Sequence, residues 1–313
     1  MHQSANPWVQ TLSAYQPGKS AAVDGLARRP VKLSSNENPR GGAARIAHLL
    51  ASQSDCDIGR YPDDASALLR TALAGQLGLA LDNVLVGSGS SDILSMVAKT
   101  FLAPGRVALI SSCTFSLYRV IAQAVGADIN VVPPDDYGHD LDALVRAAAS
   151  SHLVLIDNPC NPSGRYLPYA SLARFLAGLR SDLPVVIDEA YFEYATQSDY
   201  ASCIDLIERH PNLLVVRTFS KAHGLAGARL GYCIGHPQLI GLVNRMRAAF
   251  NVSVLASQLG IAALSIPELR QQCGRARAPG RRAGRNGHHC SGVGCQLPVP
   301  PGAPRRGPTG PVA

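Results

Sequence analysis

The sequence predicts an α/β fold in which a mostly parallel β-sheet carries helices on both faces. Between residues 84 and 265, short apolar runs rich in β-branched residues alternate with amphipathic helical stretches. These runs are hydrophobic almost throughout, which is typical of strands buried on both sides. A chain of 313 residues, 46% of them hydrophobic, is long enough to bury such a core. Ligands of parallel sheets bind beyond the carboxyl ends of the strands, so functional residues are expected there.

Strands and helices follow one another in a regular order along the chain. The expected strands are Val84–Val86, Val107–Ser111, Ile129–Val132, Leu153–Asp157, Val185–Glu189, Leu213–Arg217 and Tyr232–Ile234. The expected helices lie near residues 90–102, 115–125, 140–149, 168–180, 238–249 and 254–265. Helices between successive strands favour the crossover connections that parallel pairing requires.

Charge and composition exclude several classes of protein. The net charge is +7, but the whole excess lies in residues 274–313, so the rest of the chain has no basic bias toward nucleic acid. No apolar run reaches the ~18 residues that span a bilayer, and residues 1–19 contain no apolar signal core. We therefore expect a cytoplasmic protein, without a nucleic-acid or membrane partner, whose eight cysteines are reduced thiols.

Lys221 is one of four lysines and has the most distinctive surroundings. It follows the apolar run Leu213–Val216, and small and hydroxyl residues flank it, which leaves room for a bulky cofactor and its phosphate. An amine attacks carbonyls once burial or nearby cations lower its pKa, and Arg229 supplies a positive charge eight residues later. By itself, the pattern around Lys221 fits an ordinary surface lysine equally well.

Two further polar residues follow apolar strands. Asp188 could pair with the pyridine nitrogen of pyridoxal phosphate (PLP), because protonation of that nitrogen makes the ring an electron sink. Taken alone, Asp188 is more simply read as a helix cap. The two Asn-Pro steps in Asp157–Gly164 predict a tight loop from which Asn161 could bond a ring oxygen.

A loop of glycine and serine, Gly87–Asp92, connects the first strand to the helix expected at residue 90. Glycines allow close backbone approach, and serine hydroxyls with the free N–H groups of a helix start can bind a phosphate. A capped helix start is the simpler interpretation of this loop when it is considered alone.

Together these four patterns, in this order, resemble the fold-type I aminotransferases of the histidinol-phosphate aminotransferase group, which are class II-like. Leu12–Lys19, Lys32–Pro39 and Arg60–Asp63 resemble that group specifically, and the resemblance runs from about residue 8 to 272. It implies a PLP-dependent transferase fold, a homodimer, and ping-pong transamination between histidinol phosphate and 2-oxoglutarate in histidine biosynthesis. It implies no metal.

The resemblance also implies roles for the matching residues. Lys221 would hold the cofactor covalently and move the substrate α-proton, while Asp188 would pair with the ring nitrogen. Other residues would contact the cofactor ring, namely Phe115 by stacking and Asn161 and Tyr191 at the phenolic oxygen. The phosphate would be held by Ser90, Ser91, Thr218, Ser220 and Arg229, and in the neighbouring subunit's site by Tyr61. Asn36 and Asn38 would lie near the substrate.

The chain departs from that group mainly in its last forty residues. Nine Gly, seven Pro and seven Arg occur there with no acidic residue, so we interpret residues 274–313 as a disordered and non-native, for example out-of-frame, tail. Translating the coding DNA in the other two frames tests this interpretation. The expected organisation is an N-terminal arm over 1–35, a large PLP-binding domain over 36–273, and a small C-terminal domain largely missing with its carboxylate-binding arginine. Four residues of the tail, His288, His289, Cys290 and Cys295, resemble metal ligands but lack an apolar scaffold.

Three alternative functions share these patterns. An aromatic-amino-acid aminotransferase would have every motif, and so would a PLP decarboxylase of the phosphothreonine type. A PLP-binding remnant with impaired catalysis would follow from the missing small domain. Rates with competing substrates, release of carbon dioxide, and turnover by the purified chain distinguish these alternatives.

Overall fold

The computed structural model describes residues 4–10, 12, 15, 34–38, 48, 51 and 57–266. Its centre is a seven-stranded sheet in the order β1-β9-β8-β7-β6-β2-β3. The strands are β1 (Val84–Gly87), β2 (Val107–Ser111), β3 (Asp128–Val132), β6 (Leu153–Asp157), β7 (Val185–Asp188), β8 (Leu213–Thr218) and β9 (Gly231–Gly235). Only β9 runs against its neighbours, and the pairs β2–β3, β2–β6, β6–β7 and β7–β8 are parallel. The predicted mostly parallel sheet is confirmed.

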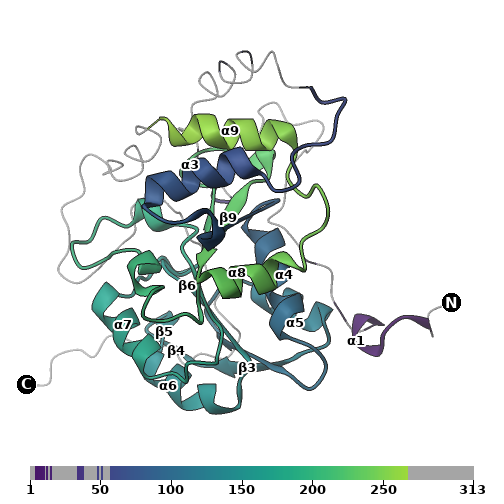
Figure 1. Cartoon of the computed structure of the whole chain (residues 1–313). Helices are drawn as coiled ribbons and strands as arrows, with labels where there is room; N and C mark the ends of the chain where they lie inside the picture. Colours follow the sequence, from purple (N-terminus) through teal and green to yellow (C-terminus); the bar gives the residue numbers. More distant parts are fainter. Residues whose placement is uncertain are drawn as a thin grey trace, which may run out of the picture.

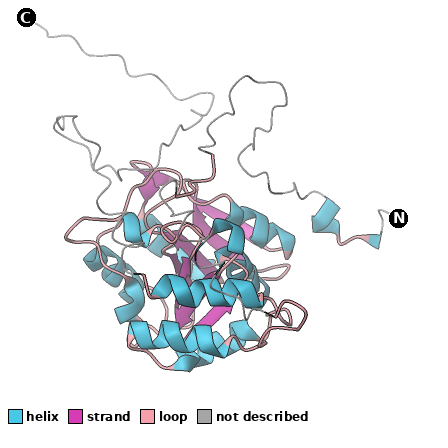
Figure 2. Cartoon of the chain, turned by 90° about the horizontal axis from the view of Figure 1, so that it is seen from above, coloured by secondary structure: helices cyan, strands magenta, loops and turns pink. Residues whose placement is uncertain are grey.

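Helices cover both faces of this sheet (Figures 1 and 2). One face packs against α3 (Ala67–Leu77), α6 (Leu141–Ala147), α7 (Tyr169–Ala177) and α9 (Val254–Leu264). The other face packs against α4 (Ser90–Phe101), α5 (Leu117–Ala124) and α8 (Pro237–Asn244). Successive strand residues serve opposite faces: in β6, Val154 and Ile156 pack on the first side, while Leu153 and Leu155 pack on the second. This double burial explains the uninterrupted apolar runs in the sequence.

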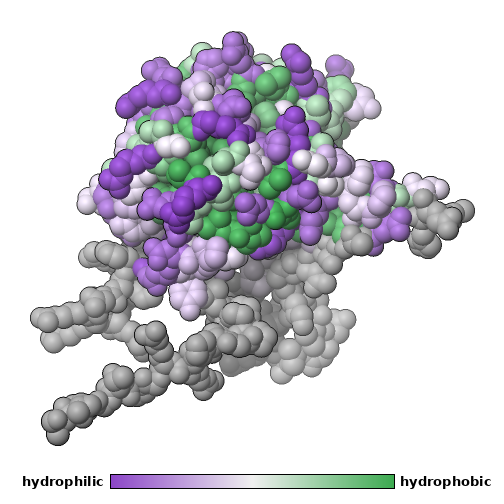
Figure 3. Space-filling model, turned by 90° about the horizontal axis from the view of Figure 1, so that it is seen from below, coloured by the Kyte–Doolittle hydropathy of each residue, from purple (hydrophilic) through white to green (hydrophobic). Residues whose placement is uncertain are grey.

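Shorter elements complete the described part of the chain. They are α1 (Pro7–Gln10), the hairpin of β4 (Pro134–Asp135) and β5 (Gly138–His139), and the 3₁₀ turns η2 (Leu81–Asn83), η3 (Ala148–Ser150), η4 (Phe192–Tyr194), η5 (Cys203–Leu206) and η6 (Ala226–Ala228). No helix among the described residues is long and apolar enough to cross a membrane. Seen from below, hydrophilic side chains cover much of the coloured surface, with smaller apolar patches between them (Figure 3).

Helix ends follow local capping chemistry. Asp140 precedes α6 and accepts a hydrogen bond from the Ala143 N–H at 2.8 Å, and Ser253 precedes α9 and accepts from the Ala256 N–H at 3.1 Å. Each cap satisfies an N–H group that has no partner inside the helix, which fixes where the helix begins.

The prediction of a helix near residues 238–249 is wrong in its second half, because α8 ends at Asn244. Beyond it the chain forms a turn in which Phe250 has a left-handed φ of 56°. The carboxylate of Asp64, far away in sequence, accepts hydrogen bonds from Arg247 and from the Phe250 N–H and holds this turn. A long-range ion pair therefore overrides the local helical pattern. Helix α3 and the hairpin β4–β5 were not predicted.

Several predictions fall outside the described residues. They concern the tail 274–313 with its candidate metal ligands and most of the arm 1–35. The four cysteines within the described residues, Cys113, Cys160, Cys203 and Cys233, are free thiols. The division of the chain into domains remains a prediction.

Candidate active site

One cavity at the carboxyl ends of the strands collects most of the predicted site residues. Its volume is about 570 Å³, within the range of roughly 300–1,000 Å³ typical of small-molecule sites. The predicted residues that line it are Asn36, Ser90, Ser91, Phe115, Asn161, Asp188, Tyr191, Thr218, Ser220, Lys221 and Arg229. The strand order brings these residues together, because the strands preceding their loops end at one edge of the sheet.

Lys221 enters the cavity from the loop after β8. The Ser220 N–H donates to Thr218 Oγ1 at 3.1 Å, which turns the chain directly after the strand. Lys221 Nζ donates to the Ser35 carbonyl oxygen at 2.7 Å and lies 5.5 Å from the centre of the Tyr191 ring. The amine therefore lies within the site, between β8 and the passing segment 34–38.

Asp188, at the end of β7, lines the same cavity and is only 3% exposed. Burial, reinforced by the nearby charge of Asp157, raises the pKa of the Asp188 carboxyl to about 7. The Tyr118 hydroxyl donates to it at 3.2 Å, and the Ala190 N–H donates at 3.1 Å. The ion pairs among the described residues do not include Asp188. A protonated ring nitrogen facing Asp188 would supply a countercharge, so this residue fits the predicted cofactor.

A phosphate could be held at the start of α4. Ser90 and Ser91 form its first turn, where backbone N–H groups lack helical partners and the helix dipole favours an anion. Arg229 donates to Ser220 Oγ at 3.3 Å and to the Ala226 carbonyl oxygen at 3.1 Å. Its guanidinium occupies the space beside Gly89, where an added Cβ would lie 2.4 Å from Nη2. A fixed cation, hydroxyls and a helix start thus converge on one end of the cavity.

Gly231, in β9, lets the strand backbone lie directly against the backbone at the start of α4. Replacing Gly231 should therefore weaken cofactor binding. A Cβ added at Gly231 would lie 2.5 Å from the Ser90 nitrogen and 2.7 Å from the Gly89 carbonyl carbon, which are backbone atoms that must then move. We expect Gly231→Ala to raise the dissociation constant for PLP by about tenfold to a hundredfold, because misplacing a site by ~1 Å has effects of this size. Spectroscopic titration of the purified variant measures this.

Gly227→Ala is the matched control, because an added Cβ at Gly227 meets no atom within 4 Å. This variant should bind PLP as the parent does. Equal dissociation constants for the two alanine variants would contradict the steric explanation.

The walls of the cavity are aromatic and amide groups. Phe115 stands edge-to-face with Tyr118, with 5.7 Å between the ring centres, so the residue that bonds Asp188 also supports the predicted stacking residue. The Tyr191 hydroxyl accepts a hydrogen bond from Asn36 Nδ2 at 3.0 Å. Burial raises the pKa of Tyr191 to about 12, so its phenol stays protonated and can donate at neutral pH.

Sequence reasoning missed a polar cluster in the wall of the cavity that is centred on Asp157. This carboxylate is 3% exposed and accepts hydrogen bonds from Thr114 Oγ1 and from the Asn161 N–H. His139 Nε2, from β5, lies 3.2 Å from its Oδ1. Asp157 therefore fixes the loop that carries Asn161. The available signal was its position, because Asp157 ends an apolar strand just as Asp188 does.

Two predicted residues do not line the cavity. Asn38 donates from Nδ2 to the Ala222 carbonyl oxygen at 2.9 Å, so it contacts the backbone next to Lys221. Tyr61 is 82% exposed and stacks on Phe250, with 4.5 Å between the ring centres. Tyr61 lies outside the cavity of its own chain, which is consistent with its expected action on a neighbouring subunit.

The fold and this cavity define a PLP-dependent transferase of fold type I, with a lysine, a buried aspartate, and an arginine beside a helix start at the carboxyl edge of the sheet. Residues 28–283 match the family described as aminotransferase class I and II. The chain belongs to this aminotransferase family.

Named relatives and a solved structure agree with this membership. Histidinol-phosphate aminotransferase 2 of Pseudomonas fluorescens Pf-5 is 43% identical over 268 residues, which cover 83% of this chain and 72% of that protein. Histidinol-phosphate aminotransferase 1 of Nitrosococcus oceani is 41% identical over 269 residues, covering 84% and 72%. The crystal structure of histidinol-phosphate aminotransferase from Sinorhizobium meliloti in complex with pyridoxal-5′-phosphate superposes with a TM-score of 0.79. It is 28% identical and covers 87% of this chain and 73% of that one.

Proposed function

We propose that this aminotransferase uses PLP bound at Lys221 to transfer the amino group between histidinol phosphate and 2-oxoglutarate. The observation that carries the proposal is the convergence of Lys221, Asp188 and the anion-binding start of α4 on one cavity. The choice of substrate is supported by relatives of 39–43% identity named histidinol-phosphate aminotransferase.

Each residue of the cavity has a proposed task. When bound, the cofactor supplies an electron-accepting ring that stabilises negative charge at the substrate α-carbon. The buried Asp188 carboxylate would favour positive charge on the ring nitrogen of the bound cofactor. Lys221 places an amine in the cavity that can accept a proton at Nζ and return it. Tyr191 and Asn161 orient the ring through its phenolic oxygen.

The anion-binding end would fix the other side of the cofactor. Arg229 and the N–H groups at the start of α4 would bind the phosphate dianion, while the hydroxyls of Ser90, Thr218 and Ser220 would donate hydrogen bonds to it. Because Arg229 is already held by Ser220 and the Ala226 carbonyl, little side-chain entropy is lost on binding. Asn36 and Asn38 are proposed to lie beside the substrate, on the segment that reaches Tyr191 and Ala222.

The proposed assembly is a homodimer in the cytoplasm. An exposed Tyr61, held away from its own cavity, supports a role at the site of a second copy. Sedimentation of the purified chain measures whether two copies associate.

Substrate comparison tests the proposed specificity. The purified chain, loaded with PLP and supplied with 2-oxoglutarate, should form glutamate at least about tenfold faster with histidinol phosphate than with phenylalanine, measured as kcat/KM. A faster reaction with phenylalanine would assign the chain to aromatic amino acids. Carbon dioxide release would indicate a decarboxylase. A cofactor spectrum without any turnover would identify a PLP-binding remnant.

A further inference from the structure

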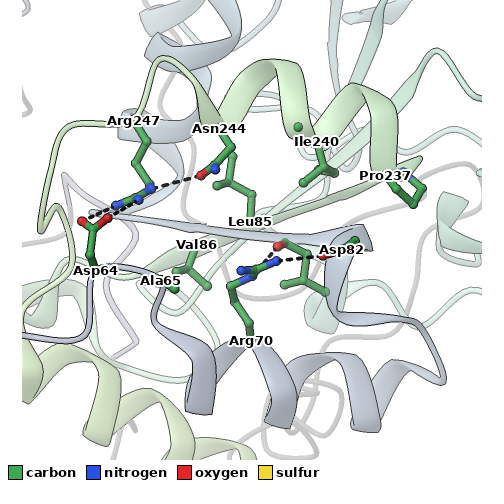
Figure 4. A pocket seen from close by; sticks show the side chains of 12 residues that line it. Asp64, Ala65, Arg70, Asp82, Leu85, Val86, Pro237, Ile240, Asn244 and Arg247 are labelled. Carbon is green, nitrogen blue, oxygen red and sulfur yellow. Dashed lines mark hydrogen bonds and ion pairs between the residues drawn. The ribbon is translucent and has the colours of Figure 1, made fainter.

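The turn that follows α8 is held by the carboxylate of Asp64. Asp64 Oδ1 and Oδ2 accept hydrogen bonds from the two terminal nitrogens of Arg247 at 2.9 and 2.8 Å, and Oδ1 also accepts from the Phe250 N–H at 2.7 Å. Arg247 donates from Nε to Asn244 Oδ1 at 3.0 Å, and its side chain is only 14% exposed. Figure 4 shows Asp64 and Arg247 bonded to each other at one end of a pocket of about 290 Å³ beside α8.

This contact is strong and geometrically fixed. The forked guanidinium meets both carboxylate oxygens, which is the most specific form of ion pair. Hydrogen bonds from Arg247 and Phe250 hold the pKa of Asp64 well below its usual range, so the carboxylate stays ionised near neutral pH. The turn therefore keeps its shape without help from a helix.

On one side, the turn fixes the exposed ring of Tyr61. Tyr61 precedes Asp64 by three residues and stacks on Phe250 with an interplanar angle of 23°. Asp63 accepts hydrogen bonds from the Ala65 and Ala67 N–H groups, which ties the same loop to the start of α3. An exposed tyrosine ordinarily samples several rotamers. Stacking on Phe250 favours one of them, which lowers the entropic cost of binding a partner.

On the other side, the turn supports the phosphate-binding loop of its own chain. Asn251 Nδ2 donates to Asp92 Oδ2 at 2.9 Å, and the same oxygen accepts from the Ser88 N–H at 2.9 Å. Ser88 precedes Gly89 and Ser90, which begin α4 at the anion-binding end of the cavity. One turn therefore determines the positions of two separate groups, the loop Ser88–Ser91 and the ring of Tyr61.

We propose that the turn Arg247–Asn251 is a positioning element for two phosphate contacts at once. Through Asn251 and Asp92 it orients the Ser88–Ser91 loop in its own site, and through Asp64 and Phe250 it orients Tyr61 toward the site of a second copy of the chain. The inference rests on the proposed function, since it assumes PLP at Lys221 and pairing of two copies. Asp64 and Asp92 are positioning residues, because each acts through another group.

Hybrid dimers separate the two effects. Subunits with different affinity tags are co-expressed, and one subunit of each pair carries Lys221→Ala, so that only the other subunit produces the absorption band that depends on Lys221. Asp64→Asn or Asp92→Ala is then placed on either subunit. Titration of PLP, followed at that band, gives the dissociation constant of the single intact site.

The two variants should give opposite patterns. With Asp64→Asn on the Lys221→Ala subunit, the intact site receives a poorly placed Tyr61, and its dissociation constant should rise about tenfold, as expected when one hydrogen bond to a charged group is lost. With Asp64→Asn on the subunit that keeps Lys221, the loosened turn acts on the intact site only indirectly, through Asn251 and Asp92, so the dissociation constant should rise less than in the first arrangement. Asp92→Ala should weaken binding about tenfold only on the subunit that keeps Lys221.

Asp57→Asn is the matched control, because Asp57 also pairs with an arginine near Tyr61, at 3.0 Å from Arg60, but both side chains are exposed. It should leave PLP affinity unchanged in both arrangements. If Asp64→Asn does not fold, Phe250→Leu removes the stacking partner of Tyr61 and should show the same pattern across subunits.

Weakening by Asp64→Asn that is as large in its own subunit's site as in the neighbouring one, or absent from both, would overturn the proposal, and so would a chain that sediments only as a monomer. A parent chain without any Lys221-dependent band would instead show that the proposed function is wrong, and this inference would fall with it.

Discussion

Replacing Lys221 with alanine should abolish the visible absorption band of the PLP-loaded protein. The band requires a covalent bond between the cofactor and an amine, and the Lys221 amine lies in the cavity, bonded to the Ser35 carbonyl oxygen at 2.7 Å. Turnover should fall by about 10⁴-fold or more, because the same amine is the proposed proton carrier. The absorption spectrum and the rate of glutamate formation measure the two effects.

Lys99→Ala is the matched control for this experiment. Lys99 is the other lysine in the described part of the chain, and it is exposed in the last turn of α4. Its replacement should leave both the spectrum and the rate unchanged. A Lys221→Ala protein with the parent's spectrum would reject the assignment of the cofactor-binding lysine.

Replacing Asp188 with asparagine should stabilise the cofactor-free protein at pH 8 while it removes most of its activity. The Asp188 carboxyl has a pKa of about 7 in the fold, mainly because of burial, and about 3.9 in an unfolded chain. Above pH 7 the fold therefore contains a buried charge that asparagine lacks. We expect a gain in the free energy of unfolding of a few kcal/mol at pH 8. We expect turnover of the PLP-loaded variant to fall by about 10²–10³-fold, the typical effect of losing one preorganised electrostatic group.

The stability gain of Asp188→Asn should grow as pH rises. Between pH 4 and pH 7 the folded protein binds the Asp188 proton and the unfolded chain does not. The stability that the protonated Asp188 carboxyl allows is therefore fully present below pH 4 and is lost as pH rises through 7. Parent and Asp188→Asn should therefore have similar stability near pH 4 and diverge toward pH 8. Urea denaturation at both pH values measures the difference.

Asp205→Asn, at an exposed aspartate in η5, provides the comparison. Its stability should follow that of the parent at both pH values. An advantage of Asp188→Asn that is the same at pH 4 and pH 8 would contradict an origin in a buried charge.

The strands were predictable from sequence because their signal is local. Four successive apolar residues, Leu153–Ile156, can be buried together only where both faces of the strand are covered. In the structure β6 consists of these four residues and Asp157, and all five are buried. The helix after β9 was predicted too long because its end is decided by Asp64, about 180 residues away in the chain. A contact between residues so far apart leaves no signal in the local sequence pattern.

The candidate site also contains residues that the sequence predicted and residues that only the folded structure shows. Four features lie at the carboxyl ends of strands or a few residues beyond them, namely Lys221, Asp188, Asn161 and the Gly87–Asp92 loop. Their position in the sequence therefore already placed them at one edge of a mostly parallel sheet. Asp157 was missed although it ends an apolar strand as Asp188 does. His139, in β5, could not be found from sequence, because only the folded chain brings its Nε2 to 3.2 Å from the Asp157 carboxylate.

The sequence by itself determined the class of sheet, the order of its functional loops and the residue types able to bind a cofactor. The tertiary structure alone decided three things: the burial that raises the pKa of Asp188, the seat of Arg229 beside Gly89, and the rigid presentation of Tyr61 by Asp64 and Phe250. The physical reason is range. Apolar periodicity acts between neighbours along the chain, whereas desolvation, steric fit and ion pairing depend on groups that meet only after the chain has folded.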